Sequence, residues 1–204
     1  MKILTMKFGG TSVADVDRIR AVRDIISDEI RDGWNVVAVV SAMSKETNKL
    51  IDLAKQVGVE NLVDPEYDSL ISTGEDVSAS LLAIALNSID ISSRSWRGWQ
   101  LPIRTDSFHS NAKIEEIKTN QIINSFKEGV KVAVVSGFQG MEQAGRITTL
   151  GRGGSDTSAV AIAATIDAER CDIYTDVSGI YTTDPRIKRN ASKLKKISFE
   201  EMLE

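Results

Sequence analysis

The sequence has 204 residues, 42% of them hydrophobic, so it is long enough to bury one sizeable core, and we expect one domain. Its formal net charge of −4 and isoelectric point near 5.2 exclude a general attraction to nucleic acid or anionic membranes. The single cysteine, Cys171, excludes a disulfide within the chain and fits a reducing, cytoplasmic setting. An anionic ligand must therefore be held by a local cluster of donors.

Strands and helices alternate from the first predicted element onward. Residues 3–7 predict a strand, a turn follows over 8–12, and apolar residues then recur at helical spacing from Val16 to Ile30. Residues 36–40 and 132–135 are continuous valine-rich runs, typical of parallel strands buried on both faces. Further helices are expected over 47–57, 75–87 and 119–126. The alternation predicts an α/β fold around a largely parallel sheet.

Two glycine-containing stretches, 137–149 and 177–183, are expected as hairpins or loops near strand ends, where open α/β sheets hold ligands. Met1 and Lys2 run directly into the first strand, and no apolar run approaches the ~20 residues of a membrane span. We therefore expect a soluble protein. Residues 200–204 have a helical pattern without a stop signal, so the chain looks cut there.

Residues 7–12, Lys-Phe-Gly-Gly-Thr-Ser, are the first candidate ligand site. Gly9 and Gly10 allow backbone N–H groups to approach an oxyanion, and the following helix is expected to direct its positive end there. Lys7, at the carboxyl end of the strand, could stabilise the charge of a transferring phosphoryl group. An ordinary strand–turn–helix fits the same residues, and taken alone they leave both interpretations open.

Residues 151–156, Gly-Arg-Gly-Gly-Ser-Asp, are expected to open another helix. This segment offers unpaired N–H groups, the guanidinium fork of Arg152 for a carboxylate, and the carboxylate of Asp156. A helix cap is the better explanation for Ser155 and Asp156 when each is taken singly. Capping explains Arg152 between glycines less well, and an amino-acid-like ligand would suit the segment.

Two more segments allow both a structural and a functional interpretation. Residues 72–76 fit a helix cap with Glu75 in the first turn. Residues 175–186 follow a strand and combine polar side chains, an aromatic ring and an arginine, which suits a nucleotide pocket and an exposed turn equally well. We expect the sole histidine, His109, to have a packing or surface role.

Four segments, occurring in this order, resemble the aspartokinases of the amino-acid kinase family: residues 7–13, residues 41–44 with Thr47 and Asn48, residues 72–75, and residues 148–156. The resemblance continues through 174–186 and covers nearly the whole chain. It implies a three-layer α/β/α sandwich with a largely parallel central sheet, of the carbamate kinase-like type. It also implies one catalytic domain over 1–204, incomplete at its C-terminus and without regulatory ACT domains.

The resemblance implies roles for individual residues. Lys7 and Asp156 would be catalytic, Arg152 would pair with the α-carboxylate of L-aspartate, and Glu75 would pair with its α-ammonium group. The other substrate-binding residues would be Ser41, Thr47, Gly153, Gly154 and Ser155. The nucleotide-binding residues would be Lys7, Phe8, Gly9, Gly10, Thr175, Asp176, Tyr181, Thr182, Asp184 and Arg186.

The implied reaction transfers the γ-phosphoryl group of ATP to the β-carboxylate of L-aspartate and gives 4-phospho-L-aspartate, the first step of lysine, threonine and methionine biosynthesis. Mg²⁺ would accompany ATP, without a metal site built from the protein alone. The implied partners are ATP and L-aspartate, with no nucleic acid and no membrane, and the full-length form would be a homo-oligomer.

Two alternatives stay open. Family members continue into a Gly-x-Lys-x-Leu-His-Pro segment whose lysine also reaches the nucleotide phosphates, and this chain stops before it. A catalytically inactive nucleotide-binding fragment is therefore the alternative function. Relatives acting on glutamate, acetylglutamate, carbamate or UMP share the fold, but they lack the string at 7–13 followed by that at 72–75.

Overall fold

The computed structural model of the protein describes residues 1–58, 63–176, 179, 187–188 and 190–194. The chain divides into two units, Met1–Tyr174 and Thr175–Glu204. All helices and strands of the described residues lie in the first unit. The helix expected over 200–204 and most of the loop expected over 177–183 lie outside the described residues.

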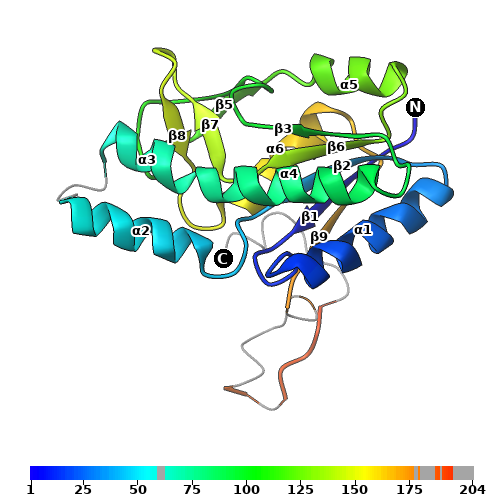
Figure 1. Cartoon of the computed structure of the whole chain (residues 1–204), viewed down its shortest axis with the longest axis horizontal. Coiled ribbons are helices and arrows are strands. Elements are labelled where there is room, and N and C mark those ends of the chain that lie inside the picture. The colour runs from blue at the N-terminus through cyan, green and yellow to red at the C-terminus, as the bar shows by residue number, and fades with distance from the viewer. Residues whose placement is uncertain (59–62, 177–178, 180–186, 189, 195–204) are drawn as a thin grey trace. The chain divides into compact units, whose positions relative to one another are not determined.

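The central sheet has five parallel strands in the order β3-β6-β2-β1-β9 (Figure 1). Their bounds are β1 (Ile3–Phe8), β2 (Asn35–Val40), β3 (Ser93–Trp96), β6 (Val132–Ser136) and β9 (Arg170–Tyr174). The valine-rich runs form β2 and β6, which pair directly at the middle of the sheet. Their continuous apolar pattern arises because both faces of these strands are covered. The prediction of a largely parallel sheet is confirmed.

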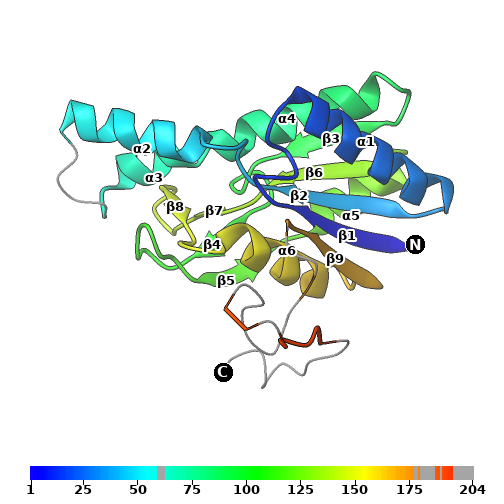
Figure 2. The ribbon, with the colours of Figure 1, turned by 90° about the horizontal axis from the view of Figure 1, so that it is seen from below.

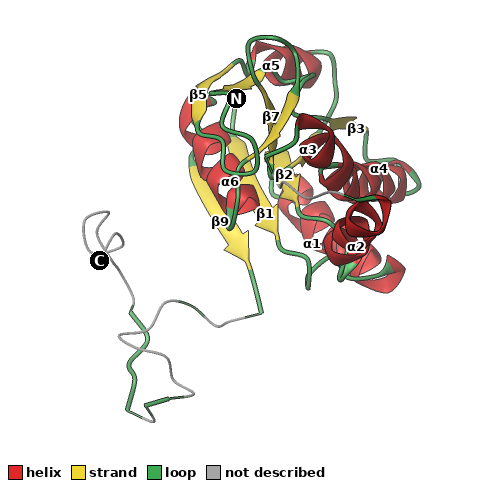
Figure 3. Ribbon diagram, turned by 90° about the vertical axis from the view of Figure 1, so that its left-hand side faces the viewer, coloured by secondary structure: helices red, strands yellow, loops and turns green. Residues whose placement is uncertain are grey.

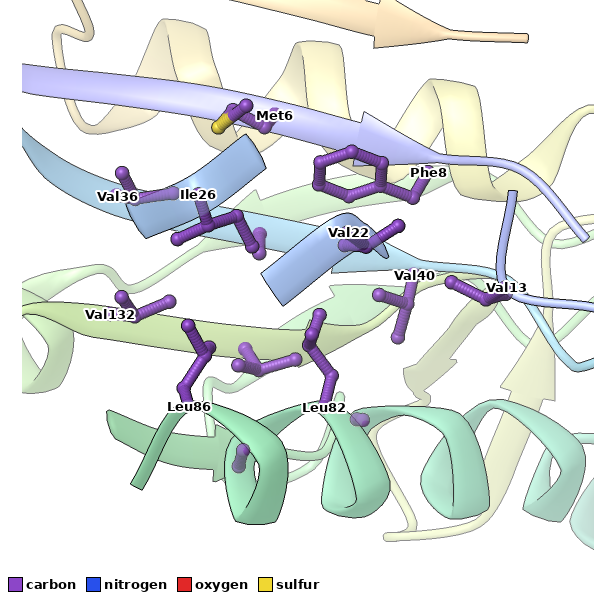
Figure 4. Packing of buried hydrophobic residues seen from close by; sticks show 14 of the residues in the cluster. Met6, Phe8, Val13, Val22, Ile26, Val36, Val40, Leu82, Leu86 and Val132 are labelled. Atoms are coloured by element: carbon purple, nitrogen blue, oxygen red, sulfur yellow. The ribbon is translucent and has the colours of Figure 1, made fainter. Parts of the chain in front are cut away.

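Helices cover both faces of this sheet, as Figure 2 shows. On one face, α1 (Val16–Arg31) and α4 (Thr73–Asn87) pack against alternate strand residues such as Met6 and Phe8, forming the cluster drawn in Figure 4. On the other face, α5 (Asn120–Lys127) and α6 (Gly154–Thr165) pack against the intervening residues, including Val37 and Val39. The layers are therefore helix, sheet and helix, as expected.

The helix predicted over 75–87 begins earlier than its sequence suggests. Helix α3 (Pro65–Ile71) runs into α4 through Ser72, so the hydroxyls of Ser72 and Thr73 donate back to the carbonyls of Ser69 and Leu70. The expectation that these residues cap a helix is wrong, because they lie within a continuous helix. A separate helix, α2 (Glu46–Val57), confirms the prediction over 47–57.

The joined helix Pro65–Asn87 has 23 residues and enough apolar character to cross a membrane by length and composition. No unbroken apolar run has this length, because polar residues interrupt the helix along its course. Half of its most apolar stretch is buried inside the protein, so this feature is weak evidence for a membrane span. Leu82 and Leu86, for example, face the central sheet (Figure 4).

A second, four-stranded sheet has the order β5-β4-β7-β8. Figure 3 labels two of its strands, β5 and β7. Its strands are β4 (Ile103–Thr105), β5 (Ile114–Ile117), β7 (Gln139–Met141) and β8 (Ile147–Thr149). Strands β7 and β8 form the hairpin expected within 137–149. The other two strands have only three and four residues, too few for a recognisable periodicity, and the sequence analysis did not find them.

Candidate active site

The carboxyl ends of β1, β2, β6 and β9 lie in register at one edge of the central sheet, because Phe8 aligns with Val40 and Tyr174, and Val40 aligns with Ser136. The backbone amides just beyond the strands continue the pairing: Ser41 N–H donates to the Phe8 carbonyl at 3.1 Å, and Gly137 N–H donates to the Val40 carbonyl at 3.0 Å. The segments that follow these strands are therefore held side by side, at the edge where open α/β sheets bind ligands.

Lys7 lies at this edge and forms an ion pair with the first turn of α6. Its Nζ is 2.6 Å from Asp156 Oδ1, and only 8% of the residue is exposed. The Asp156 side chain is half exposed, so the pair lies at the boundary between the core and solvent. The two residues expected to be catalytic, 149 positions apart in the chain, are thus in direct contact, and a cation is held where an anionic ligand can reach it.

The glycine turn after β1 differs in part from its expected role as a phosphate cradle. Gly9 N–H already donates to the Tyr174 carbonyl at 3.3 Å, and α1 begins only at Val16. The carboxylate of Asp15 accepts the N–H of Arg18 at 2.9 Å, so a side chain of this protein already caps α1. Asp15 therefore already satisfies one N–H group at the positive end of α1, whereas the sequence predicted that this end is directed at a ligand.

Close packing explains why glycines occupy this turn. A Cβ atom at Gly10 would lie 3.1 Å from the Ala42 carbonyl oxygen, and one at Gly9 would lie 3.4 Å from Lys7 Nζ. Side chains here would crowd the segment after β2 and the ammonium group of Lys7. The glycines keep the approach to Lys7 open, which serves the expected function even though the Gly9 amide is already used.

Glu75 is a buried carboxylate with one unsatisfied oxygen. Only 4% of the surface of Glu75 is exposed. Its Oε1 accepts the Ala42 N–H at 3.0 Å, whereas Oε2 has no hydrogen-bond donor among the described residues. Burial raises the pKa of Glu75 to about 7, although the hydrogen bond from Ala42 opposes the shift. An unpaired buried carboxylate oxygen is costly and is well suited to a cationic ligand group such as an ammonium.

Glycines with positive φ shape the loop that carries Arg152. Gly151 has a φ of +73° and Gly153 a φ of +74°, and Gly153 is the N-cap residue of α6. No described side chain caps this helix, so the explanation of Ser155 or Asp156 as a cap is wrong. Ser155 is buried, whereas Arg152 is exposed. The N–H groups of Gly154 and Asp156 already donate to the carbonyls of Gly151 and Gly153, so the first turn of α6 offers a ligand fewer free amides than the sequence predicted, with the exposed Arg152 beside it.

Helix α6 approaches the sheet edge very closely. A Cβ atom at Gly137, just after β6, would lie 2.8 Å from the Ser155 Cβ. Nearby, Asp76 of α4 accepts the Ser136 hydroxyl at 2.7 Å and the Gln139 side-chain amide at 3.1 Å. The first turns of α4 and α6 are thus both anchored at the carboxyl end of β6.

The remaining predicted residues fall into four groups. Ser41 and Thr47 lie on the segment from the end of β2 to the first turn of α2, both partly buried. The Phe8 side chain is fully buried and stacks on Tyr174 with 4.7 Å between ring centroids, so only its backbone can face a ligand. Thr175 and Asp176 are exposed, and the Thr175 hydroxyl donates to Asp176 at 3.2 Å. Outside the described residues lie Tyr181, Thr182, Asp184 and Arg186.

Sequence reasoning missed Asp68 of α3, which is fully buried. It contacts His109, whose burial agrees with the packing role that was one of the two expected for this residue. They are 41 positions apart, and no local pattern joins them. Within the described part of the chain, no three His, Cys, Asp or Glu side chains gather as a group that could hold a metal ion.

The chain matches the amino acid kinase family over residues 2–204. An aspartokinase from Bacillus sp. strain MGA3 is 52% identical over 204 residues, and one from Geobacillus stearothermophilus is 50% identical. Each alignment includes all of this chain but only 49% and 50% of those proteins. The chain therefore spans about half the length of the curated relatives it matches.

Solved structures give the same relationship. The aspartate kinase from Synechocystis is 45% identical, with a TM-score of 0.82 over 98% of this chain and 33% of that one. Aspartokinase III from E. coli, solved with aspartate and ADP, is 29% identical, with a TM-score of 0.81 over 95% and 53% of the two chains. An isopentenyl phosphate kinase at 16% identity and a TM-score of 0.68 shares the fold alone.

Proposed function

Since the chain belongs to the amino acid kinase family, we propose that it carries the aspartate-binding and phosphoryl-transfer site of an ATP-dependent aspartate kinase. One observation carries this proposal: a buried lysine paired with Asp156 and a buried, half-satisfied Glu75 both occur among the segments at the carboxyl edge of the sheet. The first suits a phosphoryl group and the second an amino acid's ammonium group. The relatives named above as aspartokinases support the choice of acceptor.

The proposed reaction is a direct displacement at the γ-phosphorus of ATP. An oxygen of the aspartate β-carboxylate forms a bond to phosphorus while the bond to the β,γ-bridging oxygen breaks, giving 4-phospho-L-aspartate and ADP. The nucleophile is already ionised near neutral pH, so no residue has to remove a proton. Positioning and charge stabilisation are then the tasks of the protein.

Each charged residue of the site has a task in this reaction. Lys7 stabilises the negative charge on the transferring group, and Asp156 holds the ammonium of Lys7 in place at 2.6 Å. Glu75 receives the α-ammonium group of aspartate through Oε2, and Arg152 binds the α-carboxylate. Ser41, Thr47, Gly153, Gly154 and Ser155 complete the amino-acid pocket.

Mg²⁺ enters with ATP as part of the substrate in this proposal, bound by phosphate oxygens. In this arrangement the carboxylates of the site have other tasks, because Asp156 pairs with Lys7 and Glu75 has an oxygen free to accept a cationic ligand group. Residues 175–186 would bind the nucleotide. We further propose a cytoplasmic enzyme that forms homo-oligomers and acts in lysine, threonine and methionine biosynthesis.

The second candidate function is a nucleotide-binding fragment without turnover. It is favoured by the alignment with only about half of each curated relative. In that case the residues described here would bind ligands, and the remaining phosphate contacts would have to come from a longer polypeptide.

The deciding experiment measures ADP release from Mg-ATP and L-aspartate by the 204-residue chain. The same chain, extended at its C-terminus with the corresponding half of an aspartokinase relative, is assayed in parallel. Turnover by both chains supports the kinase proposal as it stands, and turnover by the extended chain alone supports the fragment. Turnover with L-glutamate but not with L-aspartate contradicts the proposed acceptor. Lys7→Ala serves as the control for contaminating kinases.

A further inference from the structure

The fully buried carboxylate of Asp68 collects donors from two other segments of the chain. His109 Nδ1 lies 2.9 Å from Oδ2, and the Ser110 N–H donates to the same oxygen at 2.9 Å. Thr149, the last residue of β8, donates its N–H to Oδ2 at 3.0 Å and its hydroxyl to Oδ1 at 2.7 Å. Helix α3, the turn at 109–110 and the end of β8 therefore meet at one carboxylate.

These contacts make Asp68 hard to replace. A buried carboxylate is stable only when donors satisfy its oxygens, and here both oxygens accept. Loss of the carboxylate would leave several buried donors without an acceptor, so the three segments would no longer be fixed relative to one another.

The segment fixed by Asp68 continues directly into the loop that carries Arg152. The Ala112 N–H donates to the Thr149 carbonyl at 2.9 Å, and the Leu150 N–H donates to the Phe138 carbonyl at 2.9 Å. A Cβ atom at Gly151 would lie 2.6 Å from Asn111 Oδ1, so the same turn that bonds Asp68 also packs tightly against the start of the loop. Arg152 is the next residue and is exposed.

We propose that Asp68 is a positioning residue that sets the orientation of residues 150–155 and thereby of Arg152, without touching the substrate itself. This inference rests on the proposed function for the role of Arg152, and on the contacts of Asp68 alone for the placement of the loop. Thr149 transmits the constraint, because it holds both oxygens of Asp68 and immediately precedes the loop.

Four substitutions separate positioning from general stability. Asp68→Asn replaces one acceptor oxygen with an amide that donates, and Thr149→Val removes the hydroxyl bond to Oδ1 while preserving shape. Thr149→Ser retains that hydroxyl and is the conservative variant expected to restore function. Ile122→Val is the matched control, because it removes one methylene group from the fully buried core beneath α5 and leaves Asp68 and the loop unchanged.

The first measurement is amide hydrogen exchange of the ligand-free chain, resolved by residue. Asp68→Asn is expected to speed exchange at Ser110 and at 149–152 by about tenfold or more, while amides in β2 and β6 change little. The second is calorimetric titration with L-aspartate and, separately, with ADP. Asp68→Asn and Thr149→Val are expected to weaken aspartate binding about tenfold, with ADP affinity unchanged within about twofold.

Thr149→Ser and Ile122→Val should both bind aspartate as the unmodified chain does. The inference is overturned when Asp68→Asn lowers only the thermal midpoint and leaves loop exchange and aspartate affinity unchanged. It is equally overturned when Ile122→Val weakens aspartate binding as much as Thr149→Val does, because the effect then follows from stability. If the unmodified chain binds no aspartate, the proposed function fails, and loop exchange alone still decides the role of Asp68.

Discussion

The ammonium group of Lys7 is the charge on which the proposed chemistry depends most. Lys7→Ala removes the cation beside Asp156 and should lower kcat by about 10³-fold in a chain that turns over, because a fixed charge at the transferring group is lost. Aspartate affinity should stay within about threefold, since Lys7 does not contact the amino acid in the proposal. Steady-state kinetics and calorimetry measure the two effects.

Lys7→Arg is the companion variant, because it retains the charge but presents a planar fork in place of a compact ammonium. It should recover only part of the lost kcat. A Lys7→Ala enzyme that keeps more than about a tenth of the original kcat would contradict the role given to this lysine.

Glu75 should make stability depend on pH. Burial raises its pKa from 4.5 to about 7, so the folded protein holds a proton that the unfolded chain releases from about pH 4.5 upward. The stabilisation is fully present below pH 4.5 and is lost as the pH rises to about 7, at up to about 1.4 kcal/mol per pH unit. Urea unfolding at several pH values measures this dependence. In Glu75→Gln the free energy of unfolding should no longer fall between pH 4.5 and about 7.

The same carboxyl should make aspartate binding depend on pH in the opposite direction. An α-ammonium group pairs with the ionised form of Glu75, so affinity should rise as the pH increases through about 7. Calorimetric titrations of the unmodified chain and of Glu75→Gln measure the two profiles. The variant should bind weakly and show little pH dependence over the same range; a variant that retains the full profile would place the titrating group elsewhere.

At the scale of secondary-structure elements, the contact between the end of β6 and the first turn of α6 should be sensitive to a single methyl group. In Gly137→Ala the new Cβ would lie 2.8 Å from the Ser155 Cβ, so α6 has to shift. We expect a loss of about 1–3 kcal/mol in the free energy of unfolding and a lower kcat, because Asp156 moves with the helix. Urea unfolding and turnover measurements test both parts.

Gly129→Ala is a control for the conformational cost of replacing a glycine. Gly129 has a φ of +101°, and a Cβ there would have no atom within 4 Å. Its substitution should therefore cost only about 1 kcal/mol of backbone strain, and kcat should not change. An equal loss of kcat in both variants would show that the position of α6 is not the cause.

The elements that the sequence predicted well are those with long, one-sided or continuous apolar patterns. Strands β2 and β6 belong to this group because nearly every residue in them is buried, and helices α1 and α2 because apolar residues recur every third or fourth position. Strand β4, with three residues, carries no such pattern. The prediction for Ser72 was wrong because a serine hydroxyl can either cap a helix start or donate to a carbonyl of the preceding turn. Ser72 does the second, because helix α3 precedes it.

The contacts within the candidate site were predictable only in part. The resemblance to aspartokinases brought Lys7 and Asp156 together, and the structure pairs them. The burial of Glu75 and its unsatisfied oxygen depend on how α4 packs beside Ala42, which no spacing reveals. The bond between Asp68 and Thr149 joins positions 81 residues apart, so only the assembled fold shows it.

At the scale of the whole molecule, we expect that aspartate binding needs only the first unit, whereas full nucleotide affinity also needs the second. The first unit, Met1–Tyr174, contains both sheet-covering apolar clusters and also Lys7, Glu75 and Asp156. The second unit begins at Thr175, where the expected nucleotide-binding segment begins. A chain of residues 1–174 should therefore fold on its own core and retain the amino-acid pocket.

We expect this shortened chain to unfold cooperatively and to bind L-aspartate within about threefold of the 204-residue chain, since the proposed pocket residues all precede Tyr174. Its affinity for ADP should fall by about tenfold or more, because the contacts expected from residues 175–186 are gone. Calorimetric titration with each ligand measures both. Arg186→Ala in the 204-residue chain is the control, because it removes one expected nucleotide contact and keeps the chain length. Unchanged ADP affinity in the shortened chain would place nucleotide binding within residues 1–174 and contradict the assignment of 175–186.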